Sequence, residues 1–100
     1  YGITAGTGGI VTLKTALAGH CADKNIRVNS IAPGAVLTAR VKKLMSAGNG
    51  SGPDQKMAER HLLGMGETDQ VAPVSLFFAC ADSRWVTGQI LPVDGGACMN

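Results

Sequence analysis

The side chains that most often carry metal, redox or acid–base chemistry are few and scattered in this sequence. Three cysteines stand at Cys21, Cys80 and Cys98, and no two of them have CxxC spacing. Their odd number and wide separation argue against a disulfide framework and against a structural zinc site. The two histidines, His20 and His61, lie far apart with no carboxylate pattern nearby, and we interpret them as ordinary surface residues. We therefore expect no metal site.

A proline–glycine pair is the first pattern that points to ligand binding. Pro33-Gly34 closes the run Ile26–Ala32, whose β-branched residues predict a short strand. Proline fixes the direction in which the chain leaves the strand, and glycine lets backbone approach a ligand without the clash of a Cβ atom. The same pair could equally be a simple strand terminator, so the residues around it must decide between the two interpretations.

Composition and charge fit a folded domain and exclude two other classes of protein. Hydrophobic residues make up 45% of the 100-residue chain and charged residues 16%, which suits a packed core. The net charge is +2 and only Lys42 and Lys43 are adjacent, so there is no basic stripe for nucleic acid. The longest apolar stretch, Val71–Ala81, contains Pro73 and is too short to span a bilayer. We expect neither a nucleic-acid nor a membrane partner.

The elements that must position the turn alternate between helix and strand. Apolar residues at spacings of three and four predict a helix from Gly9 to about Ala22, which Asn25 can end in a left-handed conformation. Helices are also expected over 39–47, 53–63 and 68–81, a flexible glycine-rich loop over 48–53 and a last strand over 88–93.

Two strands joined by a helical crossover imply an α/β fold with parallel pairing. Parallel sheets are buried on both faces and have several strands, so two strands are incomplete on their own. The chain is then part of a doubly wound domain, or it borrows strands from a partner. The chain begins at Tyr1 and not at Met, and we expect residues to precede it.

Four motifs follow one another in an order that identifies a family. Ile26–Gly34 reads IRVNSIAPG and is followed by Thr38; next come Gly64–Glu67, Val86–Gln89 and Val93–Gly96. At this spacing they resemble the C-terminal part of the domain of short-chain dehydrogenases/reductases, across essentially the whole chain. Within the last motif we interpret the Asp-Gly-Gly turn as structural.

This resemblance implies a fold, a cofactor and a site. Residues 1–100 would be the C-terminal portion of a single Rossmann-type domain, a doubly wound parallel sheet that binds NAD or NADP. Pro33, Gly34 and Val36 would line the nicotinamide, and Thr38 would hydrogen-bond its carboxamide or a phosphate. The loop 48–53 would lie in the substrate-covering region. The implied reaction is hydride transfer between NAD(P) and an alcohol or carbonyl substrate.

The family's proton-transfer residues are a Tyr-x-x-x-Lys pair on one helix, and the sequence departs from that pattern. Tyr1 is the only tyrosine and would be the catalytic residue, yet Ala5 stands where the lysine belongs. Counting back from Ile26 instead places Ile3 and Thr7 at the two positions. Lys14 lies more than three helical turns beyond Tyr1, too far to serve.

We expect the 100 residues alone to be inactive. The run Gly6–Gly9 follows no strand and lacks GxGxxG spacing, so it is not a phosphate loop. An alternative function is therefore open: a non-catalytic or truncated family member that acts through subunit association. By the same resemblance, residues 68–81 and 88–93 would join copies in a homo-oligomer. The unpaired cysteines fit the cytoplasm.

Overall fold

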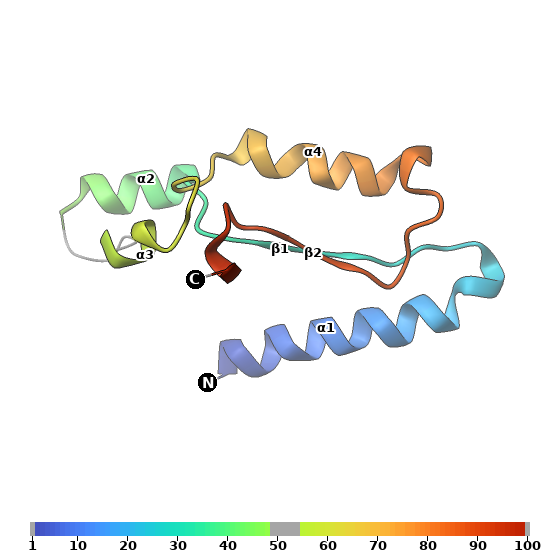
Figure 1. The fold of residues 1–100 in the computed structure, drawn as a ribbon. Helices are drawn as coiled ribbons and strands as arrows, with labels where there is room; N and C mark the ends of the chain where they lie inside the picture. The colour runs from blue at the N-terminus through green and yellow to red at the C-terminus, as the bar shows by residue number, and fades with distance from the viewer. Residues whose placement is uncertain (1, 49–54, 100) are drawn as a thin grey trace. The chain divides into compact units, whose positions relative to one another are not determined.

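The computed structural model describes residues 2–48 and 55–99, which alternate between helix and strand (Figure 1). In chain order the elements are α1 (Gly2–His20), the 3₁₀ turn η1 (Ala22–Lys24), β1 (Ser30–Pro33), α2 (Ala39–Ser46), α3 (Gln55–Glu59), α4 (Thr68–Ala79), the 3₁₀ turn η2 (Ala81–Ser83), β2 (Ile90–Val93) and the 3₁₀ turn η3 (Ala97–Met99). The α/β class and the order helix, strand, helices, strand are confirmed.

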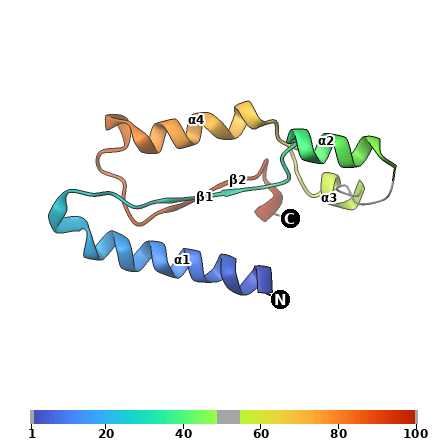
Figure 2. The same ribbon diagram turned by 180° about the vertical axis from the view of Figure 1, so that it is seen from behind.

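The two strands pair directly and run in parallel, side by side in both views (Figure 1, Figure 2). The Ser30 amide donates to the Gln89 carbonyl at 2.9 Å, and the Gly34 amide donates to the Val93 carbonyl at 3.0 Å. Both members of the second pair lie four residues beyond those of the first, which is the register of parallel strands. The helical crossover between them explains this direction, because a tight turn can join only antiparallel strands.

Contacts divide the chain into two units, Tyr1–Ile31 with Leu76–Leu91 and Ala32–Ser75 with Pro92–Asn100. In the first unit, α1 packs its Lys14 and Ala18 toward the segment before β2. The Lys14 Nζ donates to the Gly88 carbonyl at 2.7 Å, and both Lys14 and Ala18 are buried. The apolar residues whose spacing predicts this helix form a stripe along it, and three of them, Ile10, Leu13 and Leu17, are 62%, 56% and 39% exposed. The stripe therefore does not face the core of this unit.

Arg27 anchors the end of α4 in the same unit. Its guanidinium donates to the carbonyls of Phe78 at 2.7 Å, Cys80 at 3.4 Å and Val86 at 3.3 Å. The last carbonyls of a helix lack partners within the helix, and an arginine can satisfy several at once. Ser83 is fully buried and donates to two of the same carbonyls.

The first strand is shorter than the sequence predicts, because side chains replace part of its backbone ladder. The Val28 amide donates to the Thr87 hydroxyl at 3.1 Å, and the Gln89 amide donates to the Asn29 side-chain oxygen at 3.0 Å. The Asn29 amide group donates in turn to the Val86 carbonyl at 2.9 Å. Regular pairing therefore begins at Ser30 and not at Ile26.

Other boundaries also differ from the predictions. Helix α1 begins at Gly2 and not at Gly9, because an exposed glycine weakens a helix by only about 1 kcal/mol and does not forbid it. Asn25 has φ 57° and ends this region as predicted. Helix α4 ends at Ala79, and strand β2 begins at Ile90. Of the predicted loop 48–53, residues 49–53 lie outside the described residues.

Candidate functional site

The segment after β1, residues 34–38, is held on two sides. Gly34 is bonded to the end of β2, as described above. The Ala35 carbonyl accepts from the Gly66 amide at 2.9 Å, and the Leu37 amide donates to the Gly66 carbonyl at 2.7 Å. Val36 and Gly66 thus form an isolated parallel bridge. The proline–glycine turn is therefore a fixed part of the second unit and more than the end of a strand.

Gly34 is required by the space around it. A Cβ atom at this position would lie 2.7 Å from His61 Nε2, 2.8 Å from the Asp94 Cα and 2.9 Å from the Asp94 Cβ. Distances this short are not tolerated between carbon and backbone, so any side chain would force the turn and Asp94 apart. The packing of His61 and Asp94 therefore requires a glycine at position 34.

His61 supplies the acceptor for the next amide of the turn. The Ala35 amide donates to His61 Nε2 at 2.9 Å, and His61 Nδ1 lies 2.8 Å from the Met57 carbonyl. Since Nε2 accepts, Nδ1 must carry the proton and donate to Met57. The ring is only 8% exposed. The interpretation of His61 as an ordinary surface residue is wrong. No local signal could have revealed its bond to Ala35, which lies 26 residues away.

Thr38 caps helix α2. Its hydroxyl oxygen accepts from the Val41 amide at 3.2 Å, and its own amide donates to the Val36 carbonyl at 2.8 Å. A threonine in this position satisfies one of the free amides at a helix start. The hydroxyl keeps its own hydrogen to donate, and the side chain is exposed. Thr38 can therefore cap the helix and donate to a ligand at the same time.

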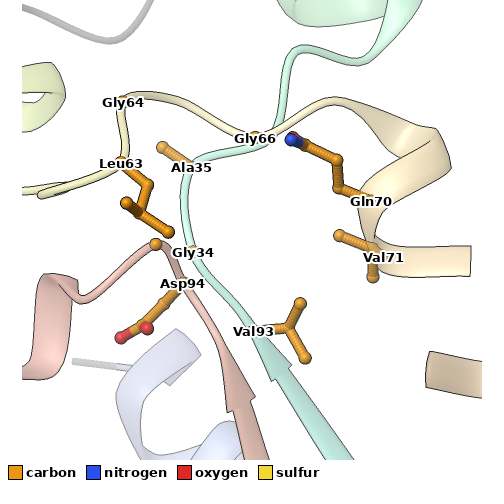
Figure 3. A pocket seen from close by; sticks show the side chains of 10 residues that line it. Gly34, Ala35, Leu63, Gly64, Gly66, Gln70, Val71, Val93 and Asp94 are labelled. Carbon is orange, nitrogen blue, oxygen red and sulfur yellow. The ribbon is translucent and has the colours of Figure 1, made fainter. Parts of the chain in front are cut away.

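A hollow of about 170 Å³ lies beside the turn (Figure 3). Its lining consists of Gly34, Ala35, Leu63, Gly64, Gly66, Gln70, Val71, Val93, Asp94 and Gly95. Val93 and Val71 point toward one another across it, and Asp94 points to the opposite side of its strand (Figure 3). Small-molecule sites usually occupy about 300–1,000 Å³, so this hollow by itself is too small for a dinucleotide.

A wider hollow of about 440 Å³ borders the same turn. Gly34 and Ala35 line it together with Met57, Arg60, His61 and Ala97. Its size falls within the range of small-molecule sites. The turn therefore has one small apolar hollow and one larger hollow that His61 helps to form.

The Asp94 carboxylate binds the backbone of the residues that follow it. One Asp94 oxygen accepts from the Gly96 amide at 3.1 Å and the other from the Cys98 amide at 2.8 Å, while Gly95 and Gly96 have positive φ. Hydrogen bonding to the Cys98 side chain holds the pKa of the Asp94 carboxyl below its ordinary value. The same bond, with the negative charge of Asp94, raises the pKa of the Cys98 thiol. These contacts agree with a structural role for the turn.

The predicted site residues are only partly brought together. Gly34 lines both hollows, whereas Pro33, Val36 and Thr38 line neither. Tyr1 lies outside the described residues, so its predicted role stays a prediction. Within residues 2–48 and 55–99, no three histidine, cysteine or acidic side chains cluster to hold a metal ion. None of the helices in those ranges combines the length and hydropathy of a membrane span.

A family model described as enoyl-(acyl carrier protein) reductase matches residues 4–98. The chain belongs to the short-chain dehydrogenase/reductase family. The match confirms the resemblance drawn from the four sequence motifs, and it covers nearly every residue of the chain.

Known proteins of the short-chain dehydrogenase/reductase family are similar to this chain over most of its residues. A 3-oxoacyl-[acyl-carrier-protein] reductase from Thermotoga maritima is 34% identical over 92% of the chain and 36% of its own length. The 7alpha-hydroxysteroid dehydrogenase of Escherichia coli is 40% identical over 74% of the chain and 28% of its own length.

A solved structure extends the similarity to the fold. A crystal structure of a protein described as a putative 2-deoxy-d-gluconate 3-dehydrogenase from Agrobacterium tumefaciens, with bound NADP, has a TM-score of 0.84 and 33% identity. The match covers 97% of this chain and 39% of that one. The chain thus spans about a third of the length of its relatives, and its Rossmann-type fold class is confirmed.

Proposed function

We propose that residues 1–100 form the C-terminal part of a single NAD(P)-binding domain in an oxidoreductase that acts on alcohols or carbonyls. The observation that carries the proposal is the turn after β1. It follows the carboxyl end of β1 and is hydrogen-bonded to the carboxyl end of β2, and this is the edge at which doubly wound sheets bind nucleotides. The exposed apolar residues Ile10 and Leu13 support an incomplete domain, because such side chains are normally covered.

Four residues of this turn are proposed to bind the nicotinamide half of NAD or NADP. Pro33 and Thr38 are exposed, Gly34 borders the wider hollow, and Val36 is half-buried between them. The Thr38 hydroxyl keeps a hydrogen for a carboxamide or phosphate oxygen, and the bridge between Val36 and Gly66 holds the backbone of the turn in place. These features fit the group, which supplies the hydride when bound. The NADP held by the Agrobacterium structure supports the same choice.

Tyr1 is proposed as the residue that exchanges a proton with the substrate oxygen. A lysine on the same helix face normally lowers the pKa of such a phenol, and Ala5 cannot do so. The substrate class rests on the relatives, which are named for reactions at hydroxyl or carbonyl groups. Those names favour the oxidoreductase over a non-catalytic role.

The test is nucleotide binding and turnover by the complete protein purified from its source. We expect NADPH or NADH to bind and to be oxidised in the presence of a 3-oxoacyl thioester or an oxosteroid. Thr38→Val should weaken nucleotide binding by about five- to tenfold, the value of one hydrogen bond, while Thr38→Ser should bind normally. Failure of the unmodified protein to bind either nucleotide would overturn the proposed function.

Assembly and compartment complete the proposal. Helix α4 and strand β2 expose apolar side chains, with Leu76 at 68% and Ile90 at 41% exposure, which supports a homo-oligomer joined through these elements. Light scattering would measure its mass, and a monomer would contradict it. Cys21, Cys80 and Cys98 are free thiols, which supports a cytoplasmic location.

A further inference from the structure

The imidazole of His61 connects two segments that the proposed site needs. Its Nε2 accepts from the Ala35 amide in the turn at 2.9 Å, and its Nδ1 donates to the Met57 carbonyl in α3 at 2.8 Å. The ring is 8% exposed, so water is a poor substitute for either partner. It also stands 2.7 Å from the point where a Gly34 side chain would begin.

We propose that His61 is a positioning residue for the nicotinamide site: it fixes the Gly34–Ala35 turn in the conformation that receives the cofactor. This inference rests on the proposed function, since it names a residue that acts on the turn through the Ala35 amide. His61 lies on the wall of the wider hollow that the turn also borders. A change in the ring would thus reach the site through the Ala35 amide.

Both ring nitrogens of His61 form hydrogen bonds, and this explains the presence of a histidine at position 61. The Ala35 amide requires an acceptor, and the Met57 carbonyl requires a donor. One neutral imidazole supplies both in a fixed plane, which a flexible side chain does not. Phenylalanine would fill the same space but offer no acceptor to the Ala35 amide. Glutamine would keep an acceptor and a donor on a longer, more mobile stem.

The first test reads the hydrogen bond by NMR and requires no nucleotide. At neutral pH the nitrogen shifts of His61 should report a protonated Nδ1 and an unprotonated Nε2, with a scalar coupling between Nε2 and the Ala35 amide nitrogen. The opposite tautomer would overturn the proposal. Exchange of the Ala35 amide with deuterium should accelerate in His61→Phe and remain close to the wild-type rate in His61→Gln.

The second test reads the consequence for the cofactor in the complete protein. In His61→Phe we expect the Kd for NADP(H) and its KM to rise by about 5- to 30-fold, the effect of one unpaired buried amide, with kcat reduced far less. His61→Gln should restore most of the affinity. The matched control is His20→Phe, the same substitution at an exposed position of α1, which should leave both constants unchanged.

The outcomes separate this inference from the proposed function. If the wild-type protein binds NADP(H) and His61→Phe binds equally well, the positioning role is overturned and the proposed function stands. If His61→Phe lowers kcat and the melting temperature without changing the KM for nucleotide, His61 is merely structural and the role is again overturned. If the wild-type protein binds neither nucleotide, the proposed function fails and the positioning role fails with it.

Discussion

The two ends of the strand pair are built on opposite principles. At the entry, side chains of Asn29 and Thr87 add hydrogen bonds to the backbone bond from the Gly88 amide to the Val28 carbonyl. At the exit, the strands can pair only because Gly34 has no side chain: a Cβ atom there would lie within 2.9 Å of other protein atoms. At the start of the strands a substitution can therefore remove one hydrogen bond and leave the others. At their end, any side chain at position 34 would push the two strands apart. A site that needs a fixed backbone is better served by the second arrangement.

The largest effect is expected from Gly34→Ala. The added methyl group would meet the Asp94 backbone, so we expect the free energy of unfolding to fall by about 2–3 kcal/mol. Urea denaturation measures this loss. The matched control is Gly9→Ala in α1, where nothing lies within 4 Å, and where alanine should stabilise the helix by about 1 kcal/mol. Equal effects of the two substitutions would contradict the steric explanation.

Asn29→Asp tests the entry of the strands. The carboxylate keeps an acceptor for the Gln89 amide but loses the donor to the Val86 carbonyl, which it then faces with negative charge. We expect a loss of about 1–2 kcal/mol in the same denaturation experiment. Gln89→Glu is the same chemical change at an exposed position, where the lost bond to the Thr87 carbonyl can be replaced by water, and it should alter stability by less than about 0.5 kcal/mol.

A smaller effect is expected from the ion pair between Lys42 and Glu67. Lys42 Nζ lies 2.8 Å from the Glu67 carboxylate, and the two side chains are 54% and 45% exposed. Lys42→Met should therefore cost about 0.5 kcal/mol or less, and the difference should shrink as salt is added. The neighbouring Lys43→Met is the control. A larger, salt-independent loss would mean that Lys42 contributes by packing.

The smallest effect is expected from acid at the Asp94 turn. Because the pKa of Asp94 is lowered in the folded protein, its carboxylate stabilises the turn above its ordinary pKa of 3.8, and this contribution is lost as pH falls through the lowered value. The amide signals of Gly96 and Cys98 should shift together in that range. In Asp94→Asn they should not titrate. Titration that persists in the variant would assign it to another group.

Much of the fold can be predicted from local sequence patterns, but the contacts that shape the site cannot. Apolar spacing predicted the helices, and Asn25 and the Pro33-Gly34 pair marked the ends of two elements because each acts through its own backbone. The space around Gly34 is set by His61 and Asp94, which lie 27 and 60 residues further along the chain. The start of β1 likewise depends on the contact between Asn29 and Gln89. Only the folded chain brings such partners together.

The contact between Asp94 and Cys98 has a consequence for oxidation. Cys98 is the exposed thiol of the three, so reagents and peroxides reach it most easily. The thiolate is the species that reacts, and the neighbouring carboxylate disfavours it by raising the thiol pKa. The Cys98 thiol is therefore accessible to solvent but less reactive than an ordinary thiol. The cysteine that solvent touches most is chemically shielded by the same aspartate that shapes the end of the chain.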